Sequence, residues 1–415
     1  MNKNSKPRVT LLHYTALPII GGVENVIADH ARLFLTAGYP VTIVTGRGGD
    51  DPQLKSTNVV VVPEIDSQYS DNLKIARVLL EEGKVLPEFA SVQSRIQQQL
   101  IPVLHETDVF IAHNVLNYHF NLPLVVALHD LIDQQIAPRM IAWCHDISRY
   151  VNPSSGFEQR SGFPWDWLRI YRREVRYVAV SPRRQRMLAE TLQCAPENIR
   201  VIPNGVAAEM LWGLDDLGRR IINDFELLDA DLILLMPIRV TRAKNIEFGL
   251  RVTAALKSIG LEPRLLVTGP PDPHVPDTIQ YFQELLDLRH ELGLDGKMYF
   301  LHEKGFTLDI SQVAGLYRIC DVVLMPSHRE GFGLPILEGG LMGKPVFASN
   351  VPVVEQVPAN SVYLIAANES PDHVATRMYE WMRRTPEHRL RLSARKDFAW
   401  SRIFAREIEP LVTGS

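Results

Sequence analysis

Short apolar segments alternate with amphipathic ones along the first part of the chain. Residues 8–14 (RVTLLHY) form an apolar, β-rich run, and after a loop the apolar positions recur at helical spacing from Val23 to Phe34. Gly38 is placed to end that helix, and 41–45 (VTIVT) is predicted to be the next buried strand. A strand, a helix and a second apolar strand form a βαβ unit. This unit predicts a parallel sheet with helices on both faces.

Apolar segments of strand length recur further along. They lie at 108–112, 139–143, 177–180 and 199–206. The stretch 70–105 is polar and helical in character, and 151–166 is rich in Pro, Gly and Ser. A loop of that length between regular elements is expected to have a functional role.

The alternation weakens over 206–230 and then begins again. Strands are predicted at 231–238, 264–268, 297–301, 321–325 and 345–349, and helices at 245–258, 277–292 and 310–319. Two such series predict an α/β protein of two doubly wound, Rossmann-like domains, 1–205 and 206–395, with a helix at 396–415 that packs back on the first. In such sheets ligands bind at the carboxyl ends of the strands, so functional residues are expected at that edge.

The segment 328–346 (HREGFGLPILEGGLMGKPV) carries the most informative pattern. Gly331 and Gly333 lie in a loop that leads into a short helix, and Pro335 fits the first position of that helix. Free backbone N–H groups and the positive end of the helix dipole suit a phosphate there.

Two carboxylates belong to the same segment. Glu330 precedes the predicted helix and Glu338 lies within it, so both can face one ligand. Carboxylates accept hydrogen bonds from pairs of hydroxyls, and both sugars and ribose present such pairs. A solvated surface glutamate is the alternative. The apolar neighbours Ile336, Leu337 and Leu341 disfavour it for Glu338.

Further candidates follow other predicted strands. Arg239 and Lys244 bracket the loop after the strand at 231–238. Two cations there could neutralise a diphosphate and favour its departure, although a pair of surface cations is the alternative. Gly21–Gly22, before the first helix, allows close approach of the backbone to a phosphate. His145, directly after a strand, is a candidate by its position, although a lone histidine is more often structural.

Composition and charge exclude several classes. The 415 residues carry 44 basic and 48 acidic side chains, a net charge of −4, which gives no general attraction to nucleic acid. Cys144, Cys194 and Cys320 lack CxxC spacing and are expected to be reduced core thiols in a cytoplasmic protein. No segment approaches the ~18 apolar residues of a membrane span, and no signal peptide is expected. The sequence leaves peripheral membrane contact open.

Neither a metal nor another cofactor is predicted. The only DxD sequence, at 229–231, precedes its strand and so lies at the wrong edge of the sheet. No group of His, Cys or Asp residues has the spacing of metal ligands.

The two glutamates, in an E-x7-E arrangement with GFG after the first, resemble the signature of retaining GT-B glycosyltransferases of family 4. The resemblance extends over nearly the whole chain and rests on several separated motifs. It implies a hexosyltransferase that uses a nucleotide diphosphate sugar, UDP- or GDP-hexose, in a cleft between its two domains. In that family the first glutamate contacts the donor hexose and the second holds the ribose hydroxyls, which gives these roles to Glu330 and Glu338.

The resemblance also assigns the other motifs. It implies a cationic pair in the loop after strand 231–238, a GG pair against the donor phosphate and a histidine near the reacting centre of the sugar. The implied catalytic residues are His145, Glu330, Arg239 and Lys244. The implied donor-binding residues are Gly21, Gly22, Arg239, Lys244, Glu330, Gly331, Phe332, Gly333, Leu334 and Glu338.

The acceptor is expected on the first domain. His113 and Asn114, at the end of the strand 108–112, are predicted to line that side. The segment 169–186 is rich in arginine, and Arg172 and Arg173 adjoin the loop 151–166. They could attract an anionic acceptor, a small molecule or a glycan, or else an anionic membrane surface, and the small molecule is favoured. A solvated basic face is the alternative.

Two other functions remain open. A nucleotide-sugar 2-epimerase can share this fold, and a non-catalytic subunit could bind a sugar nucleotide. The intact set of Arg239, Lys244, Glu330, Glu338 and His145 argues against a degenerate binder. The residues do not identify the base, the hexose or the acceptor.

Overall fold

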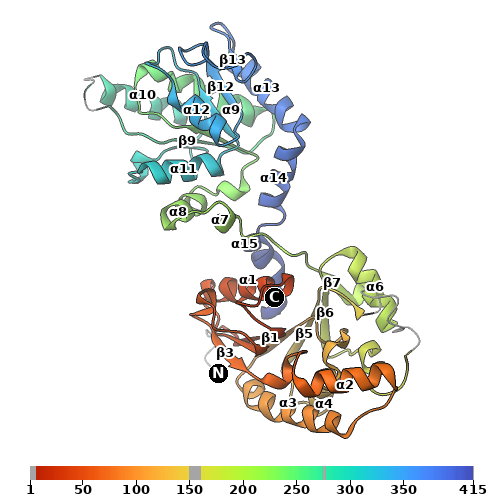
Figure 1. Ribbon diagram of the computed structural model, residues 1–415. Helices are drawn as coiled ribbons and strands as arrows, with labels where there is room; N and C mark the ends of the chain where they lie inside the picture. The colour runs from red at the N-terminus through yellow and green to blue at the C-terminus, as the bar shows by residue number, and fades with distance from the viewer. Residues whose placement is uncertain (1–5, 149–159, 273, 275–276, 415) are drawn as a thin grey trace. The chain divides into compact units, whose positions relative to one another are not determined.

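The chain forms two compact units, which Figure 1 shows in the colours of the sequence. The computed structural model describes residues 6–148, 160–272, 274 and 277–414. One unit comprises the chain up to Gly205 together with its end from Trp400, and the other comprises Val206–Ala399. The predicted loop 151–166 lies outside the described residues except for 160–166.

The described part of unit 1 is built on a seven-stranded parallel sheet in the order β3-β2-β1-β4-β5-β6-β7. Its strands are β1 (Val9–Thr15), β2 (Val41–Arg47), β3 (Asn58–Val61), β4 (Val109–His113), β5 (Arg139–Cys144), β6 (Val175–Ala179) and β7 (Ile199–Val201). The order runs one way from β1 to β3 and the other way from β4 to β7. The strand order therefore reverses between β1 and β4, which is where ligands bind in sheets of this kind.

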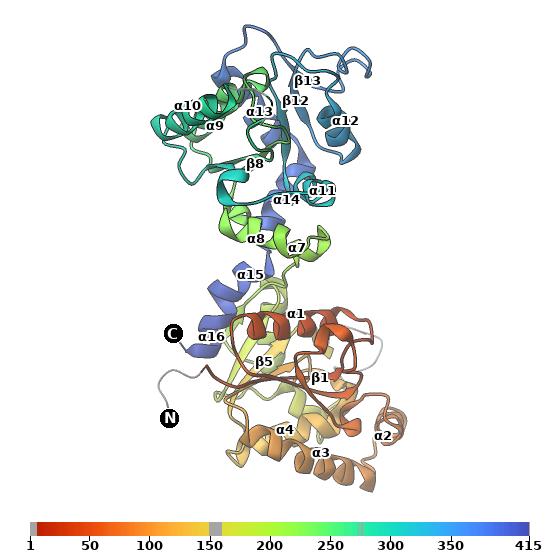
Figure 2. The ribbon, with the colours of Figure 1, turned by 90° about the vertical axis from the view of Figure 1, so that its left-hand side faces the viewer.

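Helices cover both faces of this sheet. They are α1 (Gly22–Thr36), α2 (Ser70–Glu81), α3 (Pro87–His105), α4 (Leu122–Asp133) and α6 (Pro182–Leu192). Figure 2 shows α1 on one face and α3 with α4 on the other. The central strands are apolar on both faces because both are covered, and all seven residues of β1 are buried.

The end of the chain belongs to unit 1. It consists of α15 (Trp400–Ile403), a π-helical turn (Phe404–Ile408) and α16 (Glu409–Thr413). The Phe404 ring meets Phe34 of α1 edge-on at 5.1 Å between centroids. The Tyr39 hydroxyl donates to Glu409 at 2.8 Å, and the Arg176 guanidinium donates to the carbonyl of Leu411 at 3.0 Å.

The described part of unit 2 is built on a six-stranded parallel sheet in the order β10-β9-β8-β11-β12-β13. Its strands are β8 (Leu232–Met236), β9 (Pro263–Val267), β10 (Met298–Phe300), β11 (Val322–Met325), β12 (Val346–Ser349) and β13 (Tyr363–Ile365). Its helices are α7 (Ala208–Leu211), α8 (Asp216–Asp224), α9 (Ile246–Ser258), α10 (Thr278–Glu291), α11 (Ile310–Ile319), α12 (Leu334–Leu341), α13 (Pro371–Arg384) and α14 (Pro386–Lys396). Here the strand order reverses between β8 and β11.

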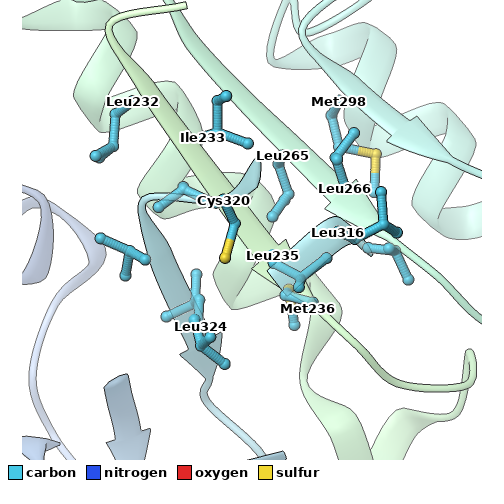
Figure 3. Close-up of a cluster of buried hydrophobic side chains, with 14 of the residues drawn as sticks. Leu232, Ile233, Leu235, Met236, Leu265, Leu266, Met298, Leu316, Cys320 and Leu324 are labelled. Carbon is cyan, nitrogen blue, oxygen red and sulfur yellow. The ribbon is translucent and has the colours of Figure 1, made fainter. Parts of the chain in front are cut away.

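Figure 3 shows part of the core of unit 2, where aliphatic side chains from β8 and β9 pack around Cys320. At the amino end of β11 lies a buried charge, Asp321. Its carboxylate accepts hydrogen bonds from Arg395 at 2.9 Å, from Arg391 at 3.0 Å and from the backbone N–H of Ile233 at 2.9 Å. These partners hold the pKa of Asp321 below its usual value against the effect of burial. The network joins α14 to the sheet at the edge opposite the carboxyl ends of the strands.

Candidate active site

The loops after β8 and β11 lie side by side because their strands are neighbours in the sheet of unit 2. Backbone bonds join them: the N–H of His328 donates to the carbonyl of Ala243 at 2.9 Å. The side-chain amide of Asn245 donates to the carbonyl of Pro326 at 3.1 Å. Asn245 adopts a left-handed conformation (φ 51°), which asparagine tolerates better than most residues. The two loops therefore form one surface where the strand order reverses.

Lys244 and Glu330 meet on this surface. The Lys244 ammonium lies 2.6 Å from one carboxylate oxygen of Glu330, and the Ser327 hydroxyl donates to the other at 2.7 Å. The Glu330 side chain is only 8% exposed, so both of its oxygens are held in place by neighbours. A nearly buried carboxylate with fixed partners can orient a bound hydroxyl group.

The loop after Glu330 leads directly into α12. Gly333 precedes the helix with φ 106°, a backbone conformation that favours glycine. A Cβ at this position would also lie 2.9 Å from the side chain of Val353. The first turn of α12 contains Pro335, and its leading N–H groups have no partner within the helix. Gly331 has open space around it, while Phe332 and Leu334 are exposed beside it. The arrangement suits a phosphate group.

Glu338 lies on α12 at the edge of a cavity of about 490 Å³. Its carboxylate accepts a hydrogen bond from the Tyr317 hydroxyl at 2.6 Å. The pKa of Tyr317 is raised, first by burial and then by this carboxylate. The prediction that Glu338 is embedded among apolar neighbours is wrong. Glu338, Leu337 and Leu341 are exposed, because α12 turns only Ile336 and Gly339 to the sheet.

The rest of this cavity is apolar on one side. Its lining is Pro237, Thr268, Leu308, Asp309, Ile310, Val313, Ala314, Tyr317, Leu334, Pro335, Glu338, Leu341 and Met342. An apolar wall beside two carboxylates, those of Asp309 and Glu338, and two hydroxyls, those of Thr268 and Tyr317, suits a flat heterocycle joined to a sugar. The lining from α11 and the turn before it carries no motif, so sequence reasoning missed Asp309 and Ile310.

Arg239 lies on the loop after β8 but does not line this cavity. Its guanidinium is well exposed, and its carboxylate neighbour Asp272 lies 3.9 Å away. Gly269 allows the next loop to pass close by, since a Cβ there would lie 2.8 Å from the Cα of Arg239. The long, weakly paired side chain of Arg239 can reach toward an anion at the end of β8.

Unit 1 has its own cavity, of about 480 Å³, where the strand order reverses between β1 and β4. The lining is His13, Tyr14, Thr15, Ile19, Gly22, Val23, Glu24, Arg47, Ser67, Asn114, Tyr118, Phe120, His145 and Asn204. The predicted residues Gly22, Asn114 and His145 are thereby brought together at the carboxyl edge of the sheet. Sequence reasoning missed Arg47, the last residue of β2, and Ser67, Tyr118 and Phe120, which lie on the connections after β3 and β4 and belong to no recognisable motif.

His145 is partly buried and adjoins a cluster of buried histidines. Its Nε2 lies 3.2 Å from Nδ1 of His113, whose ring stacks on it at 5.5 Å between centroids. His113 also contacts His30, and His13 is bound to the carbonyl of His113 at 2.8 Å. Burial lowers the pKa of His145 and of His30 to about 3, and it lowers the pKa of His113 well below its usual value. The imidazoles are therefore neutral at pH 7, so His145 can act as a hydrogen-bonding group.

Asn114 holds the segment that carries His145. It adopts a left-handed conformation (φ 55°), and its side-chain oxygen accepts from the N–H groups of His145 at 3.2 Å and Asp146 at 2.8 Å. Its own N–H donates to the carbonyl of Trp143 at 2.8 Å. Asn114 therefore positions His145 while also lining the cavity, whereas His113 is fully buried beneath it.

Gly21 and Gly22 lie at the beginning of α1, as predicted from their place after β1. The carboxylate of Glu24 lies against Gly21, so close that a Cβ there would lie 2.1 Å from its Oε2. Glu24 also accepts a hydrogen bond from the Thr15 hydroxyl at 2.5 Å. This carboxylate itself lies at the positive end of α1.

Arg172 and Arg173 lie away from this cavity. They precede β6, at the amino edge of the sheet, whereas the cavity lies at the carboxyl edge. The Arg172 guanidinium donates to Asp133 at 3.1 Å and to Nδ1 of His129 at 3.0 Å. This geometry favours the alternative interpretation, a basic surface, and for Arg172 a structural ion pair at the end of α4.

Among the described residues, no three or more His, Cys, Asp or Glu side chains gather in a way that could hold a metal ion. Within the same residues, no helix combines the length and the apolar character that crossing a membrane requires.

Comparison with known proteins places these features in a class. A family model described as Glycosyltransferase Family 4 matches residues 20–209, and one described as Glycosyl transferases group 1 matches residues 219–397. Two doubly wound parallel domains in tandem, each with a cavity where its strand order reverses, define a GT-B fold. The two models together span most of the chain, which belongs to the group 1 glycosyltransferases.

Curated relatives resemble part of the chain. D-inositol 3-phosphate glycosyltransferases from Stackebrandtia nassauensis and Saccharomonospora viridis are 32% identical over 169 residues and 34% identical over 170 residues. Each match covers 40% of this chain, but only 36% and 37% of the relatives. The chain thus matches little more than a third of their length.

Solved structures align over nearly the full length at low similarity. A glycosyltransferase from Rickettsia africae ESF-5 is 18% identical, with 98% of this chain and 99% of that chain covered and a TM-score of 0.37. HepE from Anabaena, solved in complex with UDP and glucose, is 19% identical over the same shares, also with a TM-score of 0.37.

Proposed function

We propose that the protein is a retaining glycosyltransferase that moves a hexose from UDP- or GDP-hexose to an acceptor hydroxyl without a metal ion. The observation that carries the proposal is the pairing of Lys244 with Glu330 beside the N-terminus of α12. It brings a cation, a fixed carboxylate and a helix dipole to one place, as a sugar joined to a diphosphate requires. Membership of the group 1 glycosyltransferases supports the same reaction class.

Unit 2 is proposed to bind the donor. The base and ribose occupy the cavity beside Glu338, whose carboxylate accepts hydrogen bonds from the ribose hydroxyls. The diphosphate is met by Lys244, by Arg239 and by the N-terminus of α12. Glu330 accepts hydrogen bonds from the hydroxyls of the hexose.

Unit 1 is proposed to bind the acceptor and to contribute His145 to the donor sugar. In the reaction the bond between the anomeric carbon and the phosphate oxygen breaks, and its electron pair leaves with the diphosphate. A bond forms between the acceptor oxygen and the same face of the anomeric carbon, and the acceptor proton passes to the departing phosphate. Retention of configuration follows. Isolation of a covalent glycosyl–enzyme adduct would contradict this front-face route.

The test separates three functions. The purified protein is incubated with UDP- and GDP-hexoses, with and without a panel of saccharide acceptors. Free nucleotide that appears only with an acceptor identifies a transferase. Isomerised nucleotide sugar without an acceptor identifies a 2-epimerase, and binding without turnover identifies a non-catalytic subunit. Either of the last two results contradicts the proposal.

Transfer is expected to be undiminished in excess EDTA. The charge of the leaving diphosphate is met by Arg239, Lys244 and a helix terminus, so no divalent cation is needed for it. The measurement is the initial rate of acceptor-dependent nucleotide release before and after chelation, with magnesium and manganese added back. Activity that is lost in EDTA and returns only with a metal contradicts the prediction.

We infer a cytoplasmic location from the thiols. All three cysteines are free, and Cys144 and Cys320 are buried in the two cores. Buried unpaired thiols are typical of proteins from reducing compartments.

A further inference from the structure

One wall of the unit 1 cavity is aromatic. The rings of Tyr118 and Phe120 meet edge-on at 4.5 Å between centroids, and the Tyr14 ring lies 6.0 Å from that of Phe120. Tyr14 and Tyr118 are buried, but Phe120 is 45% exposed. The two tyrosines therefore support a phenylalanine ring that is open to the cavity.

The turn that carries Phe120 is firmly held. The N–H of His119 donates to the Ser148 hydroxyl at 2.7 Å. On the other side, the side-chain amide of Asn121 donates to the carbonyls of Glu64 and Ile65 at 2.8 and 3.0 Å, and its oxygen caps α4. An exposed apolar ring on a rigid turn loses little conformational entropy when a ligand covers it.

The charges on this cavity are already paired. Among its described lining, Arg47 is the one lysine or arginine, and its guanidinium lies 3.0 Å from the carboxylate of Asp66. The one carboxylate among the same described lining is that of Glu24, which accepts a hydrogen bond from Thr15 and lies at the start of α1. The imidazoles of His13 and His145 are neutral at pH 7, because burial lowers both pKa values. A phosphorylated ligand would find no unpaired cation on this described lining.

We propose that this cavity binds an uncharged pyranose ring, the terminal sugar of a glycan acceptor, with its apolar C–H face stacked on Phe120. The inference rests on the proposed function and names the acceptor class. The polar residues of the lining, among them Glu24, Ser67 and Asn114, offer acceptors and donors for the sugar hydroxyls. Neutral hydroxyls suit this lining better than a phosphate, which would lie beside the carboxylate of Glu24.

The proposal is tested by binding to the full chain. The probes are the methyl hexopyranosides of glucose, galactose and mannose, compared with glucose 6-phosphate and inositol 1-phosphate, and the readout is saturation-transfer NMR. At least one methyl hexoside is expected to bind, with an affinity that changes little between about 50 and about 300 mM NaCl. A preference for the phosphates, with affinity that falls as salt rises, overturns the proposal, and so does a panel in which no hexoside binds.

Substitutions then locate the contact. Phe120→Ala is expected to weaken hexoside binding about tenfold, the equivalent of about 1.4 kcal/mol, while Phe120→Trp keeps it. The matched control is Phe163→Ala, because Phe163 is also about half exposed (50%) on unit 1 but packs on Phe89 outside the cavity. Equal binding to Phe120→Ala and the wild type overturns the proposal.

The two ideas fail separately. UDP and GDP binding reports on unit 2 and does not depend on Phe120. If nucleotides bind and acceptor-dependent release occurs with phosphorylated acceptors alone, the acceptor class is wrong and the proposed function stands. If no acceptor ever releases nucleotide, the proposed function is wrong, whatever the hexoside panel shows.

Discussion

A Glu330→Ala variant is expected to lose transfer by about 10³-fold or more while it still binds UDP or GDP within a few-fold. Glu330 is fixed by Lys244 and Ser327, and its assigned partner is the hexose. Removing it takes away a hydrogen-bond acceptor that the sugar needs during transfer. It also frees the Lys244 ammonium, so nucleotide diphosphate affinity is expected to stay equal or to rise.

Glu338→Ala is expected to affect nucleotide binding, which Glu330→Ala leaves intact. Its carboxylate lines the cavity assigned to the nucleoside, so nucleotide affinity falls. The matched control is Glu247→Ala, since Glu247 also accepts a hydrogen bond from a tyrosine hydroxyl, that of Tyr281, but lies outside the cavity. Calorimetric titration with UDP and GDP, together with transfer rates, separates the two variants. If Glu330→Ala loses nucleotide affinity and Glu338→Ala keeps it, the two roles are exchanged.

Much of this fold could be predicted because buried parallel strands are continuous apolar runs. Apolar runs such as DVVLM and VTIVT are typical of buried strands, and β11 and β2 lie within one or two residues of the predicted bounds. The pattern of apolar positions did not predict elements that are buried on nearly all sides or hardly buried at all. Helix α4 is buried on nearly all sides and so lacks helical periodicity, and β3 and β13 are short edge strands with exposed residues. None of the three was predicted.

The candidate site was predictable where chain order fixes position. Residues that follow parallel strands must meet at one edge, which is why Lys244 and Glu330 could be expected near each other. The position of Phe120 could not be found in this way, because its turn is held by Ser148, 29 positions after the hydrogen-bonded His119. The ion pair of Arg172 could not be predicted from the sequence either. Its partner Asp133 lies 39 positions away, and no spacing rule indicates that pair.

Acidification is expected to destabilise unit 1 through its buried histidines. Burial lowers the pKa of His30 and of His145 to about 3, below the value of about 6.5 in an unfolded chain. Stability from a lowered histidine pKa is fully present above the unfolded value and is lost as the pH falls from about 6.5 toward about 3. At about pH 5 each of these histidines costs on the order of 2 kcal/mol relative to neutral pH.

His30→Phe isolates this effect. His30 is fully buried against Trp143 and Trp400, and its ring nitrogens make no hydrogen bond with the described residues. A phenylalanine keeps the ring contacts and cannot take up a proton, so stability near pH 7.5 is expected to hold or rise. The loss on going to about pH 5 is expected to shrink by about 2 kcal/mol.

Urea unfolding followed by tryptophan fluorescence measures this difference at both pH values. His105→Phe, at the exposed end of α3, is the control and should leave the pH dependence unchanged. If His30→Phe loses as much stability on acidification as the wild type, His30 is not a source of acid sensitivity. His30 would then have to tolerate protonation in the folded protein, contrary to its fully buried position.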